Sequence, residues 1–240
     1  MKKKQKRALA AAIVCMALFG ILLASLDLFD VRPIGPQNSS VGLATLNNAA
    51  KQCFGKTLGF YNPDDFSSYN HALYQVTGIL GYLAIATAPI FALAALLQLI
   101  RRKSLVRVDW DFYLLAVFYV VVGAVYVLFE KCVINYRPVD LGQGLEPSFP
   151  SSHTMLAVAL LGAAMAQIRH RVKKAPLRAL AEFACLILMA AIVAGRLLCG
   201  VHWLTDILGG LLLGAALAFF YQTMEIRLRR RQHQYRKARK

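Results

Sequence analysis

Long apolar runs are the feature that most constrains how this chain can fold. Of its 240 residues, 58% are hydrophobic, and the mean hydropathy is +0.50. Several runs are apolar on nearly every side, whereas the helices of a soluble protein carry a single apolar stripe. A helix needs about 20 such residues to cross the hydrocarbon core of a bilayer. The sequence therefore predicts an integral membrane protein.

Six segments are expected to cross the membrane within one all-α domain that spans residues 1–240. This polytopic bundle of six transmembrane helices comprises residues 8–26, 72–100, 112–129, 152–168, 180–198 and 204–224. The fourth segment is short and reaches a full crossing only if Ser151, Ser152 and His153 belong to its outer end. A secretory signal peptide is the alternative for the first segment. Its length of about 19 apolar residues and the lack of a small-residue cleavage site favour a transmembrane helix.

Basic residues are divided unevenly between the two sides of the predicted bundle. If both termini lie on one side, that side receives most of the 28 lysines and arginines. Because cytoplasmic loops are enriched in these residues, both termini are expected in the cytoplasm, with residues 225–240 as a basic tail. The net charge of +16 is then a sign of topology and not of nucleic-acid binding.

The longest loop, residues 29–70, is expected on the extracytoplasmic side. Apolar residues recur at helical spacing from Leu43 to Phe54, which predicts an interfacial helix. Two roles stay open for this helix, a substrate lid and a passive surface element.

Three polar segments are expected on that same side, each beside the end of a predicted span. They are Lys131 to Arg137-Pro138, Pro150-Ser151-Ser152-His153, and Gly195-Arg196 with His202 and Asp206. An arginine holds phosphoryl oxygens with a fork of N–H donors, and the first turn of a helix binds anions through its backbone N–H groups. A histidine four residues before an aspartate can be oriented by it. The combination is typical of phosphate chemistry at a membrane surface.

These segments resemble the three signature motifs of the type 2 phosphatidic acid phosphatase superfamily. The family motifs are a lysine with an Arg-Pro pair, then Pro-Ser-Gly-His, then Ser-Arg followed by histidine and aspartate. Three positions of this chain depart from them. Glu130 stands where the family has its lysine and Lys131 follows one residue late, Ser152 replaces a glycine, and Gly195 replaces a serine. One residue turns a helical side chain by about 100°, so Lys131 is the least secure member of the site.

The resemblance implies a hydrolase of lipid phosphate monoesters or diphosphates at the outer face of the cell membrane. His202 would attack phosphorus and form a phosphohistidine, Asp206 would orient His202, and His153 would protonate the leaving oxygen and later activate water. The implied phosphate-binding residues are Lys131, Arg137, Ser151, Ser152 and Arg196. No metal or other cofactor is expected, since cationic side chains already neutralise the phosphate. The expected partners are a phospholipid or polyprenyl phosphate and the membrane lipids, without nucleic acid, and the oligomeric state is open.

Other functions are compatible with the same residues. The phosphohistidine could pass its phosphoryl group to another lipid, which would make the protein a phosphotransferase. His153, His202 and Asp206 could instead form a metal site with two histidines and one carboxylate. A non-catalytic protein that binds or transports phosphorylated lipids is the third alternative.

The five cysteines are odd in number and do not suggest a disulfide framework. Free buried thiols are expected, and one disulfide among Cys53, Cys132 and Cys199 is the alternative.

Overall fold

The computed structural model describes residues 2–238, with side chains described as far as residue 232, and it is all-helical. Its α-helices are α1 (Lys2–Leu28), α2 (Ala44–Gln52), α3 (His71–Arg102), α4 (Trp110–Lys131), α5 (Ser152–Arg171), α6 (Ala175–Leu198) and α7 (Leu204–Ala238). Short helical turns lie at η1 (Pro36–Asn38), η2 (Cys53–Thr57) and η3 (Leu105–Arg107). Within the described residues the only extended pairings are two isolated bridges, Arg32 with Val41 and Tyr136 with Pro147.

Each predicted span lies inside one of the long helices, but only some of these are clearly membrane-spanning. Among the described residues, five helices are long and apolar enough to cross a bilayer: α1, α3, α4, α6 and α7. The fourth predicted span corresponds to α5, which does not reach that level of hydropathy. The protein is therefore an all-α membrane protein with five candidate spans.

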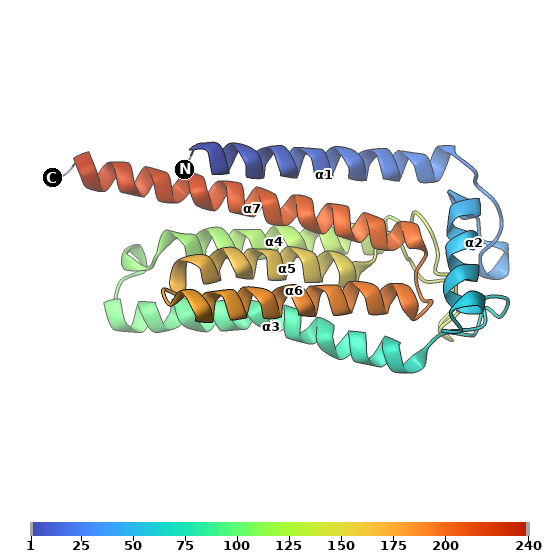
Figure 1. Cartoon of the computed structure of the whole chain (residues 1–240). Coiled ribbons are helices and arrows are strands. Elements are labelled where there is room, and N and C mark those ends of the chain that lie inside the picture. Colours follow the sequence, from blue (N-terminus) through green and yellow to red (C-terminus); the bar gives the residue numbers. More distant parts are fainter. Residues whose placement is uncertain (1, 239–240) are drawn as a thin grey trace.

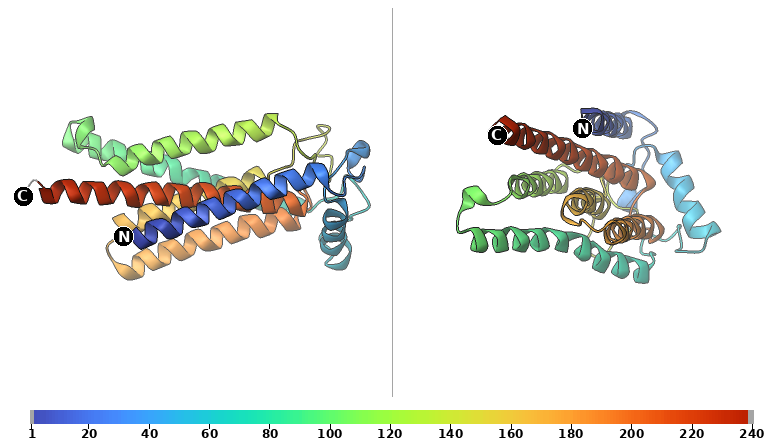
Figure 2. Two further views of the ribbon diagram at one scale, coloured as in Figure 1. Left: turned by 90° about the horizontal axis from the view of Figure 1, so that it is seen from above. Right: turned by 60° about the vertical axis from the view of Figure 1, so that its left-hand side comes forward.

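The position of α5 explains its composition. This helix lies in the middle of the bundle, with α3, α4, α6 and α7 around it (Figure 2). More than half of its residues are buried, and within the described chain none of the large exposed hydrophobic side chains lies on α5. A helix that meets protein on most sides needs close packing more than large apolar side chains.

Both described ends of the chain lie at one end of the bundle, and α2 lies across the other (Figure 1). We call these the terminal end and the loop end. The loop end holds the last residues of α4 and α6 and the first residues of α5 and α7, so all three polar segments lie there. The predicted basic tail continues α7 as a helix to Ala238, and residues 239 and 240 lie outside the described residues.

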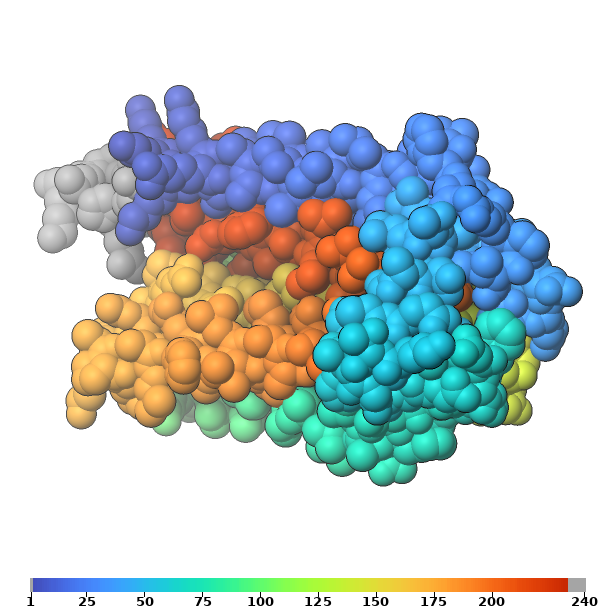
Figure 3. All heavy atoms as spheres, turned by 45° about the vertical axis from the view of Figure 1, so that its right-hand side comes forward, coloured from blue at the N-terminus to red at the C-terminus, as the bar shows by residue number. Residues whose placement is uncertain are grey.

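The predicted interfacial helix is present as α2, and it covers the loop end together with its flanking loops (Figure 3). Two polar side chains one turn apart, Asn47 and Lys51, face the protein and are buried. Asn47 Nδ2 donates to Thr205 Oγ1 at 3.0 Å, and Asn47 Oδ1 accepts from the backbone N–H of Thr205 at 3.1 Å. Lys51 Nζ donates to the carbonyl of Pro138 at 3.4 Å. One face of α2 thus contacts both the start of α7 and the Arg137-Pro138 turn.

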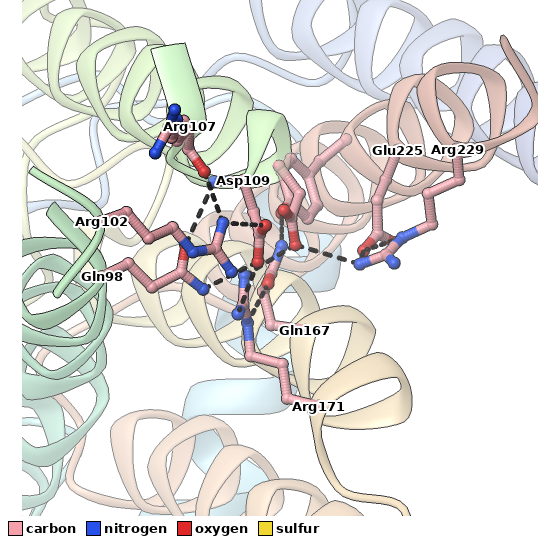
Figure 4. Close-up of polar contacts among 10 residues, drawn as sticks. Gln98, Arg102, Arg107, Asp109, Gln167, Arg171, Glu225 and Arg229 are labelled. Atoms are coloured by element: carbon pink, nitrogen blue, oxygen red, sulfur yellow. Dashed lines mark hydrogen bonds and ion pairs between the residues drawn. The ribbon is translucent and has the colours of Figure 1, made fainter. Parts of the chain in front are cut away.

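At the terminal end, charged side chains join four elements of the bundle (Figure 4). Asp111 of α4 accepts from Arg171 of α5 at 2.7 Å and from Arg229 of α7 at 3.0 Å. Asp109, just before α4, accepts from Gln98 and Arg102 of α3 at 2.7 and 2.8 Å. These contacts hold the inter-helix connections together far from the polar segments.

All five cysteines are free in the described chain, as predicted. The expectation that they are buried holds for Cys199 but is wrong for Cys53 and Cys132, which are exposed at the loop end.

Candidate active site

Close packing of α5 against α7 brings the second and third polar segments together. The backbone N–H of Ser151 donates to the carbonyl of Asp206 at 2.9 Å. A Cβ atom at Gly210 would lie 2.7 Å from the carbonyl oxygen of Ser151, and one at Gly214 would lie 2.8 Å from that of Met155. Real Cβ contacts are longer than this, so glycine at both positions permits the approach of the two helices.

The first polar segment joins the other two through its backbone. The N–H of Arg137 donates to the carbonyl of Glu146 at 3.1 Å, and the N–H of Ser148 donates to that of Asn135 at 2.9 Å. The indole N–H of Trp203 donates to the carbonyl of Tyr136 at 2.7 Å. A short antiparallel pairing of residues 135–137 with residues 146–148 therefore leads from the end of α4 to the start of α5.

His202 and Asp206 are buried together at the start of α7, with exposed fractions of 6% and 0%. His202 precedes the helix, which begins at Leu204, and Asp206 lies in its first turn. Its Nδ1 atom is 3.6 Å from Asp206 Oδ2. The same carboxylate oxygen accepts the backbone N–H of Trp203 at 2.8 Å. The predicted pairing of imidazole and carboxylate is therefore close but does not reach hydrogen-bond distance.

Ser148 is a site residue that the sequence analysis did not identify. Its hydroxyl donates to Asp206 Oδ2 and lies 3.2 Å from His202 Nδ1. The signal available in the sequence was weak, a serine two residues before the Pro150 that opens the second polar segment. Only the folded backbone brings it to the histidine, 54 residues further along the chain.

His202 lies in an environment that favours the neutral imidazole. Burial lowers the pKa of His202 well below its usual value of 6.5, and the nearby positive charges of Arg137 and Arg196 lower it further. A neutral imidazole whose Nδ1 carries the proton has a lone pair on Nε2. The Nε2 atom of His202 is buried and has no hydrogen-bond partner in the described chain.

Arg196 is the most deeply buried cation of the site, with 2% of its surface exposed in the last turn of α6. Its guanidinium carbon lies 4.8 Å from the ring centre of Tyr74 on α3. Gly195 contacts α3 as well, because a Cβ atom there would collide with the methyl group of Thr77. Close packing of α6 on α3 thus explains why glycine can stand where serine was expected.

Arg137 lines a small cavity together with His202. The cavity is bordered also by Tyr126, Glu130 and Ser152. Arg137 Nε is 2.9 Å from a carboxylate oxygen of Glu146, while its Nη1 atom has no partner.

His153 is the second residue of α5 and lies against α3. Its ring Cδ2 atom is 3.0 Å from the place that a Cβ atom at Gly81 would take. The fold thus brings together His153, His202, Asp206, Arg137, Arg196, Ser151 and Ser152.

Lys131 is not brought to this group. It is the exposed last residue of α4, and the neighbouring Glu130 is the residue that lines the cavity. The arrangement agrees with the one-residue shift in the sequence, which turns the lysine side chain away.

Several buried polar atoms of the site residues have no hydrogen-bond partner in the described chain. Among the described residues, the buried polar atoms with no hydrogen-bond partner include Arg137 Nη1, Ser151 Oγ, Arg196 Nε and His202 Nε2. Buried polar groups are normally paired, because an unpaired one costs free energy. A cluster of cationic and hydroxyl donors of this kind fits an oxyanion such as phosphate.

The described residues do not contain a group of three or more histidine, cysteine, aspartate or glutamate side chains placed to hold a metal ion. His153, His202 and Asp206 therefore do not form such a group in this part of the chain.

Comparison with known proteins agrees with this description. Residues 128–230, which hold all three polar segments, match the family model of the PAP2 superfamily. A solved structure with the same fold is the "first transmembrane PAP2 type phosphatidylglycerolphosphate phosphatase from Bacillus subtilis". It aligns with a TM-score of 0.63 and 18% sequence identity, over 90% of this chain and 96% of that chain. No curated protein matches the sequence. Residues 128–230 are therefore similar to the PAP2 superfamily, and the chain shares its fold with a solved structure of that type.

Proposed function

We propose that this protein is a membrane lipid phosphatase that hydrolyses a lipid phosphate monoester or diphosphate through a phosphohistidine. The observation that carries the proposal is that Arg137, Ser151 and Arg196 have buried donors without partners in the described chain. The Nε2 atom of His202, which lines one cavity with Arg137, has no partner there either. The match of residues 128–230 to the PAP2 superfamily and the fold shared with a phosphatase support the same activity.

In the first step, His202 Nε2 attacks phosphorus and the bond between phosphorus and the lipid oxygen breaks. Arg137, Arg196 and the backbone N–H groups at the start of α5 stabilise the charge on the peripheral oxygens. His153 gives a proton to the leaving oxygen.

In the second step, His153 takes a proton from water as that water attacks phosphorus. The bond between nitrogen and phosphorus breaks, and inorganic phosphate leaves. His202 returns to its neutral form, which burial favours.

A lipid is the favoured substrate because the cavity beside His202 borders α4, a candidate span. Tyr126 and Phe129 of this helix line the cavity. A phosphate bound there would keep its acyl or polyprenyl tail at the level of the hydrocarbon core. Phosphatidate, phosphatidylglycerol phosphate, undecaprenyl diphosphate and lipid A phosphates all meet this requirement.

The active site is assigned to the extracytoplasmic face of the cell membrane. Most lysines and arginines lie in the connections and ends at the terminal end, and cytoplasmic segments are enriched in these residues. The loop end, with the site and α2, then faces outward.

The decisive experiment measures phosphate release by the purified protein across a panel of those four lipids and a soluble phosphate ester. A His202→Ala variant should lose at least about 1,000-fold in kcat, as expected for removal of a nucleophile. His153→Ala should also be strongly impaired. His71→Ala, at an exposed histidine of the same end of the bundle, serves as the matched control and should keep full activity. Full activity in His202→Ala would refute the phosphohistidine mechanism.

Two further arms separate the alternatives. Activity should survive exhaustive chelation, because Arg137 and Arg196 supply the positive charge that a metal would otherwise provide; loss of activity that returns on adding a divalent cation would favour a metal-dependent hydrolase. Adding candidate lipid acceptors should leave free phosphate as the product, whereas a phosphorylated acceptor would identify a phosphotransferase.

A further inference from the structure

We propose that Ser148 is a positioning residue for the histidine nucleophile, because its hydroxyl joins His202 Nδ1 to the carboxylate of Asp206. The inference rests on the proposed function, since it assigns a role to Ser148 in a reaction that begins at His202. It concerns a residue outside the three polar segments from which that function was inferred.

The distances favour an indirect link between imidazole and carboxylate. His202 Nδ1 is 3.2 Å from Ser148 Oγ and 3.6 Å from Asp206 Oδ2. Hydrogen bonds from N–H to oxygen have donor–acceptor distances of about 2.7 to 3.2 Å. The hydroxyl of Ser148 is therefore within reach of the imidazole, and the carboxylate lies one step further.

The chemistry of the three groups sets the direction of both hydrogen bonds. An ionised carboxylate only accepts hydrogen bonds, so the hydroxyl proton of Ser148 points to Asp206. The hydroxyl oxygen then has lone pairs left to accept a hydrogen bond from the N–H at His202 Nδ1. This order of donors and acceptors selects the tautomer with the proton on Nδ1. The lone pair is left on Nε2, the atom that has no partner in the described chain.

Ser148 is held firmly enough to do this. It is 2% exposed, and its backbone N–H donates to the carbonyl of Asn135 at 2.9 Å. Two residues along each segment of the same antiparallel pairing, the N–H of Arg137 donates to the carbonyl of Glu146 at 3.1 Å. The same pairing of two segments therefore fixes the positions of both Arg137 and the Ser148 hydroxyl relative to each other.

The link also has a consequence for the intermediate. When Nε2 bonds to phosphorus, the imidazole gains positive charge, and Nδ1 keeps its proton. The Ser148 hydroxyl continues to accept the hydrogen bond from Nδ1–H, and it donates its own proton to the negatively charged Asp206. Removing the hydroxyl should therefore slow formation of the intermediate more than it weakens substrate binding.

The test compares Ser148→Ala, which removes the hydroxyl, with Ser148→Thr, which retains it. Ser39→Ala is the matched control, since Ser39 is another buried serine whose hydroxyl has no partner in the described chain. We expect Ser148→Ala to lower kcat by about 10- to 100-fold, as for other residues that orient a reacting group, with KM nearly unchanged. Ser148→Thr should recover much of the activity, and Ser39→Ala should behave as the unmodified protein.

A second measurement distinguishes positioning from a structural role. In protein labelled with ¹⁵N in its histidine rings, the His202 signals are identified from their loss in His202→Ala. The unmodified protein should show His202 protonated on Nδ1, and Ser148→Ala should show a mixture of both tautomers. This reading does not depend on whether Ser148→Thr folds.

The outcomes separate this inference from the proposed function. If His202→Ala is inactive and Ser148→Ala keeps full kcat, the role of Ser148 is refuted and the phosphatase proposal stands. A fall in kcat with an unchanged tautomer also refutes the role, because it would show general damage to the fold. If His202→Ala keeps its activity, the proposed function fails whatever Ser148 does.

Discussion

Two cationic side chains at the loop end are buried, although removing a charge from water costs free energy. Arg196 is 2% exposed and Lys51 is 7% exposed. A buried charge persists only where other groups compensate for the lost water. For Arg196 we propose that the substrate phosphate does so. Lys51 has a different environment, the carbonyl of Pro138 and the rings of Phe66 and Trp203, whose centres are 4.6 and 5.6 Å from its Nζ atom.

Replacing Arg196 with lysine should show whether the shape of the cation matters. Lysine keeps the charge but loses the planar fork of donors and the contact with the Tyr74 ring. We expect kcat/KM for the lipid phosphate to fall by about 10- to 100-fold, equivalent to about 1.5 to 3 kcal/mol. Arg178→Lys, at the other end of α6, is the control. Equal activity of the two variants would mean that Arg196 acts only as a distant charge.

The pH dependence of stability should reveal the buried charge of Lys51. Burial lowers the pKa of Lys51 from 10.5 to about 8. Between these values the unfolded chain binds a proton that the folded chain does not, so stability should rise as the pH increases from about 8 to 10.5. Below that window both states are charged, and the full cost of burial is present. Thermal unfolding in detergent should therefore show a steeper rise for the unmodified protein than for Lys51→Met.

Lys56→Met, at an exposed lysine of the following turn η2, should leave that slope unchanged. A Lys51→Met protein with the same slope as the unmodified one would contradict the assignment.

Among the elements, the short helix α2 depends on contacts with other parts of the chain for its stability. It has only 9 residues, and helices this short are marginal when isolated. Its stability must come from contacts such as those of Asn47 with Thr205 and of Lys51 with Pro138. In return, α2 holds the start of α7 and the Arg137-Pro138 turn in fixed positions beside the site.

Asn47→Ala should therefore destabilise the protein and disturb the site. The change leaves the buried N–H of Thr205 and the carbonyl of Gly42 without their side-chain partners. We expect a loss of about 1 to 3 kcal/mol in the free energy of unfolding and a lower kcat. The neighbouring Asn48→Ala, at an exposed position, is the matched control for thermal unfolding and activity. Equal melting temperatures for both variants would rule out the anchoring role of Asn47.

These contacts also show where prediction from the sequence stops. Helices in a bilayer satisfy their backbone locally, so the apolar runs predict all six long helices, and residues 43–54 predict α2. The polar segments predict most of the candidate site because their spacing lies within short stretches. Ser148, Asn47 and Lys51 acquire their partners only through the folded loops. Asn47, for example, binds Thr205 at a separation of 158 residues, and no local pattern indicates that contact.

At the scale of the whole molecule, the two ends of the bundle carry different groups of polar residues. The terminal end carries the network of Asp109, Asp111, Arg171 and Arg229, and the loop end carries the candidate site and α2 (Figures 1 and 4). This arrangement makes the orientation in the membrane measurable, because exposed positions are available at each end. Cys53 is exposed in η2, and Lys173 is exposed between α5 and α6.

Labelling of intact cells with a membrane-impermeant maleimide should test the orientation. A variant that keeps Cys53 as its single cysteine should react from outside. A cysteine-free variant with Lys173→Cys should react only after the membrane is opened. The reverse pattern would place the candidate site in the cytoplasm and contradict the proposed topology.

The sheltered position of α5 has a consequence for how chains of this kind are interpreted from hydropathy plots. A plot that recognises only strongly lipophilic helices would find five crossings here. Because five is an odd number, it would predict that the two ends of the polypeptide lie on opposite sides of the membrane. The fold instead brings both described ends to one end of the bundle. Because α5 is surrounded by protein, the segment that begins at the candidate catalytic centre is also the one that such a plot would overlook.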